Sequence, residues 1–248
     1  MVQVGPPLAA LAGLSGVFWV TAGLAAAGIG VTLGLVPAPA RSIGAAQRTA
    51  ASFAKVLRHS ELLRLDFAIF TLHSILTASF LVIPRILAQA LHLSTAGQWK
   101  FYLPVLAAAV VLMVPANIIA ETRGRMKDIF IAAIVAIAAS LLGLALLGGS
   151  VVAVVVALLV FFSGFNIMEA MLLSLVTKFA PAEARGAATG IYSSSQFLGI
   201  FVGGAGGGWV FAIEGSTGVL GFAFVLTMVW LTVALTMRRP RWTPRHKM

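Results

Sequence analysis

Apolar residues along this chain come in blocks of twenty or more, separated by short polar segments. A helix of about 20 apolar residues is long enough to cross about 30 Å of hydrocarbon. Transmembrane β-strands are about ten residues long and alternate strictly, and no stretch of this chain does so. The pattern therefore predicts an all-α integral membrane protein of about seven transmembrane helices. The predicted spans are residues 10–36, 65–90, 101–121, 129–148, 151–177, 187–211 and 217–237.

The longest connection, residues 41–64, is too polar to cross a membrane. Within it, Phe53, Val56 and Leu57 recur near helical spacing, with Lys55 on another face. This pattern is typical of an amphipathic helix that lies along the membrane surface. We therefore expect four parts. They are a single transmembrane helix (1–40), a cytoplasmic amphipathic linker (41–64), a six-helix bundle (65–237) and a basic cytoplasmic tail (238–248).

Composition and charge agree with this class. The chain is 60% hydrophobic and 10% charged, whereas soluble domains carry about 25% charged residues. It has no cysteine, so disulfides and thiolate metal sites are excluded; we expect no metal site and no cofactor. A net charge of +10 would suggest nucleic acid in a soluble protein.

The positions of the charges favour another explanation. Fifteen of the 17 Lys and Arg lie in the tail or in connections on one side of the membrane, and only Arg85 and Lys100 lie on the other. Basic residues gather on the cytoplasmic side of membrane proteins. We therefore predict an outside N-terminus, a cytoplasmic C-terminus, membrane lipid as the surrounding partner and no nucleic-acid partner.

Polar side chains lie deep within three of the predicted spans. An ionisable side chain in hydrocarbon costs at least about 2.5–3.5 kcal/mol, so it usually faces a cavity or a partner. His73, Glu169 and Gln196 lie on three different spans. Each is roughly 13–16 Å from the basic residue at the cytoplasmic end of its span. That depth is near the midplane, where transporter sites are found.

Structural alternatives stay open for most of these polar residues. His73 fits a neutral histidine bonded to a neighbouring backbone, and the serines at 193–195 can bond carbonyls one turn back. Asp66 lies two residues after Arg64 and is expected to be interfacial. Glu169 has no cation among its neighbours in the span. Because desolvation favours the neutral acid, a functional role is favoured for Glu169.

Glycines recur every four residues in the sixth predicted span, at Gly199, Gly203 and Gly207. Such a stripe of small residues lets another helix approach closely. A phosphate-binding glycine loop does not fit the interior of a span. We therefore expect these glycines to serve helix packing.

A resemblance to a known family rests on four stretches, SFAKVLRHSELLRLDFAI (52–69), FNIMEAMLLSL (165–175), GIYSSSQFLGIFVGG (190–204) and WLTVALTM (230–237). Together they resemble the C-terminal half of a major facilitator superfamily transporter, close to the YajR-type bacterial inner-membrane transporters. The resemblance implies two six-helix bundles around a central cavity that works by alternating access. The predicted spans then look like the sixth to twelfth helices. It also implies a bacterial inner-membrane location and a missing N-terminal half as partner.

The same resemblance extends to one loop between spans. Glu121, Gly124 and Arg125 look like a degenerate second copy of the family's cytoplasmic acidic-x-x-Gly-Arg loop. In the family, the acidic side chain of this loop meets a helix N-terminus and its cations meet carboxylates. These contacts latch one conformation, which is the role implied for the three residues here.

The leading functional hypothesis is proton-coupled export of small amphipathic molecules or drugs. Glu169 would carry the proton with His73 as candidate partner, and Asn166, Tyr192 and Gln196 would line the substrate cavity. The alternative is a non-transporting membrane scaffold or truncated remnant. An intramembrane enzyme is disfavoured, because the chain has neither paired aspartates nor an H-E-x-x-H metal motif.

Overall fold

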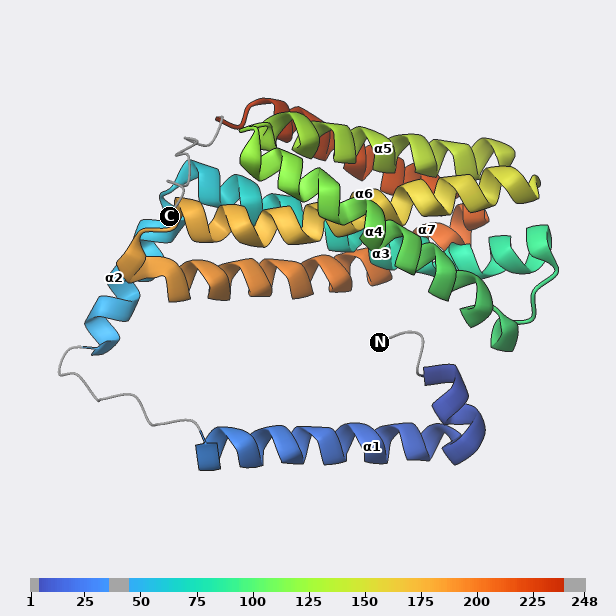
Figure 1. Cartoon of the computed structure of the whole chain (residues 1–248), viewed down its shortest axis with the longest axis horizontal. Helices are drawn as coiled ribbons and strands as arrows, with labels where there is room; N and C mark the ends of the chain where they lie inside the picture. Colours follow the sequence, from blue (N-terminus) through green and yellow to red (C-terminus); the bar gives the residue numbers. More distant parts are fainter. Residues whose placement is uncertain (1–4, 36–44, 239–248) are drawn as a thin grey trace.

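The computed structural model describes residues 5–35 and 45–238, and these described residues form helices joined by short turns (Figure 1). The helices are α1 (Gly5–Leu35), α2 (Ala45–Leu57), α3 (Ser60–Leu91), α4 (Trp99–Thr122), α5 (Met126–Leu147), α6 (Val151–Phe179) and α7 (Arg185–Leu235), with two short 3₁₀ turns, η1 (Thr95–Gly97) and η2 (Ala182–Ala184). Six of the described helices are long and apolar enough to cross a membrane. The predicted all-α integral membrane fold is confirmed.

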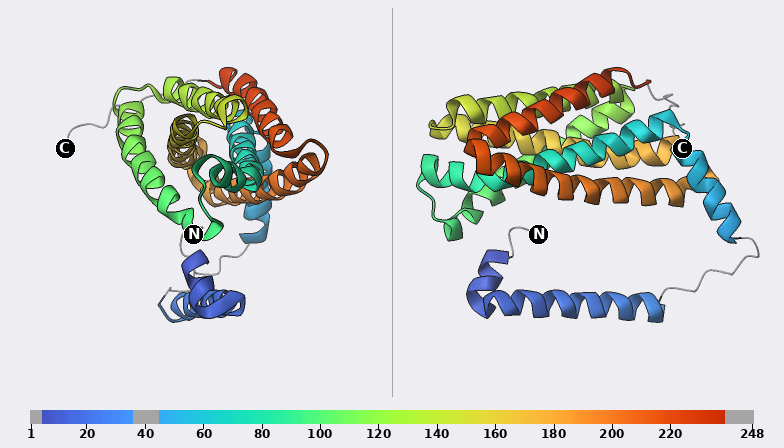
Figure 2. Two further views of the ribbon diagram at one scale, coloured as in Figure 1. Left: turned by 90° about the vertical axis from the view of Figure 1, so that its right-hand side faces the viewer. Right: turned by 180° about the vertical axis from the view of Figure 1, so that it is seen from behind.

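Helix α7 is too long for one crossing, because its 51 residues would extend about 75 Å when straight. Gly215 interrupts it with φ 64° and ψ −154°, a conformation that only glycine adopts readily. Figure 2 shows the second arm, residues 216–235, folding back beside the first arm, residues 185–214. With α7 counted as two arms, the six described helices that are long enough to span correspond to the seven predicted spans.

Helix α3 is the central helix of the bundle. Along it, Leu65, Ile69 and Leu72 are almost completely buried, and it packs closely along α7 and also against α6. Phe161 from α6 and Trp230 from the second arm of α7 are the largest fully buried side chains of the same core. The residues of α3 therefore sit where three spanning segments meet.

Helix α1 lies apart from the bundle (Figure 1). None of its residues 18–35 is buried, and large apolar side chains such as Trp19 are exposed. Gly13, with φ 67°, bends the helix before this straight segment. An exposed apolar surface of this kind suits hydrocarbon.

The border between the linker and the bundle differs from the prediction. Helix α3 begins at Ser60 instead of residue 65, because the preceding His59 caps it by accepting from the amide N–H of Leu62 at 3.4 Å. The polar Glu61 is buried within the first turn, where it pairs with Arg64. The ion pair between Glu61 and Arg64 neutralises both charges locally, so residues 60–64 belong to the same helix as the spanning segment.

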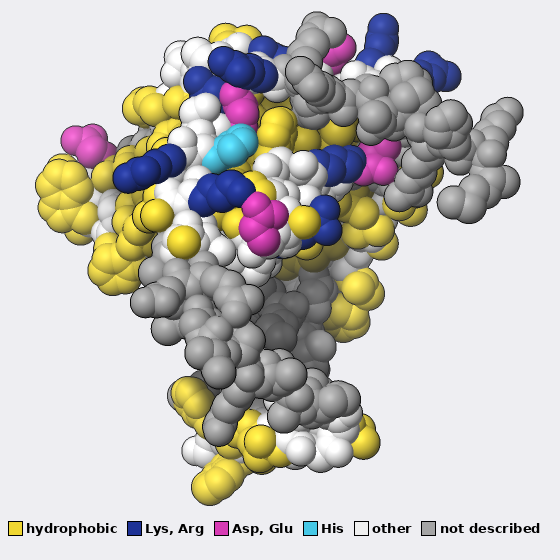
Figure 3. Space-filling model, turned by 90° about the vertical axis from the view of Figure 1, so that its left-hand side faces the viewer, with side chains coloured by type: hydrophobic (Ala, Val, Ile, Leu, Met, Phe, Trp, Pro, Cys, Tyr) yellow, Lys and Arg dark blue, Asp and Glu magenta, His cyan; other side chains and the backbone are white. Residues whose placement is uncertain are grey.

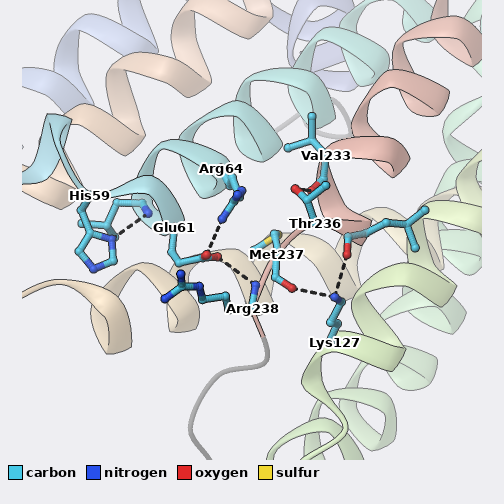
Figure 4. Close-up of polar contacts among 10 residues, drawn as sticks. His59, Glu61, Arg64, Lys127, Val233, Thr236, Met237 and Arg238 are labelled. Carbon is cyan, nitrogen blue, oxygen red and sulfur yellow. Dashed lines mark hydrogen bonds and ion pairs between the residues drawn. The ribbon is translucent and has the colours of Figure 1, made fainter.

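The end of α7 is held against the starts of α3 and α5 (Figure 4). The Lys127 Nζ atom donates to the carbonyl oxygens of Leu235 at 2.9 Å and Met237 at 2.7 Å. The backbone N–H of Arg238 points to Glu61 Oε2 at 3.4 Å. A cation beside these carbonyl oxygens stabilises the end of the helix, because the last carbonyl groups of a helix lack intrahelical partners. The predicted basic tail beyond Arg238 lies outside the described residues.

Basic side chains gather at one end of the bundle, as Figure 3 shows. This end contains the start of α3, the α4–α5 turn and the α6–α7 turn. At the opposite end, the guanidinium of Arg85 lies 4.3 Å from the ring centre of Phe211. The two ends therefore differ in charge as the sequence predicts, and the assignment of the basic end to the cytoplasm stays a prediction.

Candidate functional site

Three residues predicted from depth alone meet between α3, α6 and α7. His73 Nε2 lies 2.8 Å from Gln196 Nε2 and 3.8 Å from Glu169 Oε2. The His73 side chain is 8% exposed, whereas that of Glu169 is 40% exposed. The site therefore combines a buried imidazole with a carboxyl group that faces open space on one side.

The partners of His73 define which ring nitrogen carries a proton. Its Nδ1 atom lies 3.3 Å from the carbonyl oxygen of Ile69, and a carbonyl can only accept, so Nδ1 donates. The Nε2 atom of a neutral ring then accepts, and the Gln196 amide N–H₂ donates to it. This assignment rests on the hydrogen-bond partners, because hydrogens are inferred from the network.

Glu169 is left without a hydrogen bond in this arrangement. Its Oε2 atom is buried and has no hydrogen-bond partner among the described residues, and His73 Nε2 is too distant to donate at 3.8 Å. An ionised carboxylate without partners is very costly in such surroundings. The geometry therefore fits a protonated Glu169 beside a neutral His73.

Two further polar groups lie nearby without partners. Tyr192 is 4% exposed and Asp66 is 7% exposed, and neither Tyr192 Oη nor Asp66 Oδ2 has a hydrogen-bond partner in the described part of the chain. Asp66 is thus buried within the bundle near its basic end, and its interfacial depth stays a prediction.

The burial of Asp66 follows from the early start of α3. Because the helix begins at Ser60, Asp66 lies in its second turn and points into the bundle, while Arg64 pairs with Glu61. Asp66 and His73 are seven residues apart, so they share one face of α3. That spacing is the signal in the sequence that would have predicted a buried Asp66.

The remaining predicted cavity residue, Asn166, is half-buried on α6. Its amide N–H₂ donates to the carbonyl oxygen of Phe162 at 2.8 Å, which leaves its amide oxygen as the group available to a ligand. The Phe165 ring lies edge-on to His73, 5.6 Å between ring centres. An aromatic surface therefore borders the polar groups.

The glycine stripe of α7 lies directly against the backbone of α3. A Cβ atom added at Gly199 would lie 2.2 Å from the carbonyl oxygen of Phe70, and one at Gly203 would lie 2.3 Å from that of Ser74. At Gly207 the nearest atom, Ala78 Cβ, would be 3.0 Å away. Such close approach requires glycine, so α3 and the first arm of α7 form a tightly packed pair.

The predicted latch residues lie at the basic end. Glu121, at the end of α4, accepts from Lys178 Nζ at 2.9 Å and Ser174 Oγ at 3.1 Å, both on α6. Gly124 adopts φ 64°, and Arg125 is exposed just before α5. The acidic side chain therefore contacts the last turns of α6, and the latching role implied for these three residues stays a prediction.

A cavity of about 270 Å³ opens between α4 and α6 beside this contact. Asn117, Glu121, Met171 and Ser174 contribute to its lining. It also contains Ala170, the residue after Glu169, but Glu169 itself does not line it. The cavity was not predicted, because the sequence gives no register between α4 and α6.

Comparison with known proteins supplies the family. The profile described as Major Facilitator Superfamily matches residues 3–204 and 65–247. The chain belongs to the major facilitator superfamily. It is 38% identical over 239 residues to the inner membrane transport protein YajR of Escherichia coli (strain K12), an alignment that covers 96% of this chain and 52% of YajR.

More distant relatives agree with this assignment to the superfamily. An uncharacterized transporter of Buchnera aphidicola subsp. Baizongia pistaciae is 27% identical over 74% of this chain and 47% of that protein. Another, from Buchnera aphidicola subsp. Acyrthosiphon pisum, is 26% identical over 80% of this chain and 52% of that protein. The chain spans about half the length of the curated relatives it matches. It is a multi-pass membrane protein of a transporter family, and the predicted resemblance is confirmed at this level.

Proposed function

We propose that this chain forms part of a secondary active transporter that exports small amphipathic molecules in exchange for protons by alternating access. Glu169 is the proton carrier and His73 is its partner. The observation that carries the proposal is the buried Oε2 of Glu169, which has no hydrogen bond and lies 3.8 Å from His73 Nε2. The other half of the transporter, the bacterial inner membrane and a cytoplasmic basic end belong to the same proposal.

A carboxyl group in this position is suited to alternate between two charge states. When Glu169 is protonated, it requires no cation in its surroundings. When Glu169 is ionised, it requires a positively charged partner. A protonated His73 can be that partner if the two side chains approach to hydrogen-bond distance. The two states therefore differ in how closely α6 approaches α3, which couples proton binding to helix position.

The packing of the bundle allows such a movement. The glycine stripe joins α3 closely to the first arm of α7, and the Ser74 hydroxyl donates across this contact to the carbonyl oxygen of Gly199 at 3.0 Å. Helix α6 makes few contacts with α7. We therefore expect α6 to shift against a rigid pair formed by α3 and α7.

The substrate is inferred to be amphipathic because polar and aromatic groups adjoin at the site. Gln196 and Asn166 offer amide groups, and Phe165 lies against His73. Mixed surfaces of this kind bind molecules with an apolar body and a few polar groups. They do not define a particular substrate.

Transport in proteoliposomes tests this proposal. The full-length transporter that contains this sequence is reconstituted, a pH gradient is imposed, and movement of the amphipathic cation ethidium is followed by fluorescence. Glu169→Gln preserves size and hydrogen bonding but cannot titrate, so gradient-driven movement should fall to that of protein-free vesicles. The control, Glu214→Gln, removes an exposed carboxyl group and should retain transport.

Wild-type coupling in Glu169→Gln would exclude Glu169 as the proton carrier. If the folded wild-type protein moves neither ethidium nor protons under any gradient, the non-transporting scaffold becomes the better interpretation.

A further inference from the structure

We infer that Gln196 is a specificity-determining residue whose amide group links the charge of His73 to substrate recognition. While His73 is neutral, the amide oxygen of Gln196 is available to a substrate that carries N–H or O–H donors. When His73 is protonated, the amide N–H₂ group takes the place of that oxygen, and such a substrate is released. This inference rests on the proposed function and adds a substrate class, together with the residue that makes proton and substrate exclude one another.

Protonation of His73 changes only one of its two ring nitrogens. The Nδ1 atom lies 3.3 Å from the carbonyl oxygen of Ile69, and this oxygen accepts from an N–H in both charge states of the ring. The Nε2 atom has a lone pair in the neutral ring and an N–H in the protonated ring. Because Nε2 lies 2.8 Å from the amide nitrogen of Gln196, the change in charge occurs directly against Gln196.

The Gln196 amide can match either charge state of His73, but not in the same orientation. Its N–H₂ group donates to the lone pair of a neutral Nε2, across the 2.8 Å contact. Against a protonated Nε2 two donors would face each other, and only the amide oxygen can accept. A half-turn about the last side-chain bond exchanges the nitrogen and the oxygen of the amide. The two charge states of His73 therefore select opposite orientations of the Gln196 amide.

The end of the amide that does not contact His73 is the end that a substrate can reach. Gln196 is half-buried, whereas His73 is buried, and the neighbouring Glu169 side chain is 40% exposed. A site that is built to hydrogen-bond a ligand rejects a ligand that leaves its polar group unpaired. A ligand with an amino group therefore fits the amide oxygen that neutral His73 presents, and not the N–H₂ group that protonated His73 presents.

Other titratable groups near His73 act on the charge of a ligand and not on its hydrogen bonds. On the helices packed against α3, and on α3 itself, these groups are Glu169 of α6, Tyr192 of α7, Lys55 of α2 and Asp66 of α3. Lys55 is paired with Glu183 at the basic end. Titration of these groups changes the attraction of the site for any cation. A comparison of two cations that differ in hydrogen-bond donors therefore isolates Gln196.

Binding of ethidium and tetraphenylphosphonium makes this comparison. Both are apolar cations, but ethidium has amino groups that donate hydrogen bonds, and tetraphenylphosphonium has no donor. The dissociation constants of both cations are measured with the full-length transporter in lipid nanodiscs, from alkaline to acidic pH. We expect ethidium to bind more tightly than tetraphenylphosphonium at alkaline pH. The ratio of the two affinities should fall about fivefold toward acidic pH, the effect of one hydrogen bond.

Three variants assign this ratio to particular residues. Gln196→Met keeps the size of the side chain but removes the amide, so ethidium should bind about fivefold more weakly at alkaline pH and tetraphenylphosphonium equally well. His73→Asn cannot change its charge, so the ratio should no longer depend on pH. Gln89→Met, the same substitution at an exposed position of α3, should behave like the wild type.

The outcomes separate this inference from the proposed function. A wild-type ratio that is independent of pH, or ethidium that binds no more tightly than tetraphenylphosphonium at alkaline pH, would overturn the inference, even if no variant folds. A pH-dependent ratio that persists in Gln196→Met would overturn it as well. If the ratio behaves as expected but Glu169→Gln retains wild-type coupling in transport, the proposed proton carrier is wrong and the role of Gln196 stands.

Discussion

Gly203 is a position where the packing of α3 against α7 can be tested with one methyl group. A Cβ atom there would lie 2.3 Å from the carbonyl oxygen of Ser74, 2.8 Å from its carbonyl carbon and 2.7 Å from its Cα. All three atoms belong to the backbone of α3, so no side-chain rotation relieves the clash. Gly203→Ala must therefore separate the two helices.

The structure sets the magnitude of this effect. Ordinary contacts of a Cβ atom begin at 3.4 Å, so the helices must separate by about 1 Å, and overpacking of this kind costs about 1–3 kcal/mol. The same separation stretches the 3.0 Å hydrogen bond from Ser74 Oγ to the carbonyl oxygen of Gly199, worth about 0.6 kcal/mol in membrane proteins. We expect Gly203→Ala to lower the free energy of unfolding by about 2–4 kcal/mol.

Gly208 provides the matched control on the same arm of α7. A Cβ atom there meets nothing within 4 Å, so Gly208→Ala should be neutral or stabilise by up to about 1 kcal/mol, because alanine favours the helix. Both variants are unfolded reversibly in mixed lipid–detergent micelles, and their free energies of unfolding are compared. Values that agree within about 0.5 kcal/mol would refute the close contact between α3 and α7.

Two further predictions concern contacts at the basic end of the bundle. Lys127→Met removes the donor to the carbonyl oxygens of Leu235 and Met237. The amide hydrogens in the last turn of α7 should then exchange faster, by the equivalent of about 0.3–1 kcal/mol of lost local stability. Lys100→Met, at the opposite end of the bundle, should leave that exchange unchanged. The hydrogen bond from Lys55 Nζ lowers the pKa of the exposed Glu183 carboxyl group below its usual 4.5, so the contact of α2 with η2 should be intact at neutral pH and be lost as the pH falls through that lowered pKa. Spin-label distances between α2 and η2 measure this loss, and Glu183→Gln should abolish the pH dependence.

The sequence predicted the spanning segments well because their cause is local. An apolar block of about 20 residues has no other stable location than hydrocarbon or a core. The borders were less accurate where polar residues pair with each other. Glu61 and Arg64 neutralise each other in the first turn of α3, so the helix includes residues 60–64, which their polarity had assigned to the linker.

Contacts between helices were predictable in depth but not in register. Counting residues from the basic ends placed His73, Glu169 and Gln196 at one level, and the structure brings these three together. The same counting gave no sign that Glu121 contacts Lys178, because side-chain partners depend on how helices rotate about their axes. The burial of Asp66 was not predicted, although its seven-residue spacing from His73 places both residues on one face of α3.

Proton coupling through Glu169 is the central claim, and the direction of ethidium movement tests it most directly. Proteoliposomes that contain the full-length wild-type transporter are given equal ethidium on both sides and a pH gradient of either sign. We predict net movement toward the more acidic side, opposite to proton flow, with reversal when the gradient is reversed and none in Glu169→Gln. Movement that ignores the sign of the gradient, or that persists in Glu169→Gln, would contradict the account.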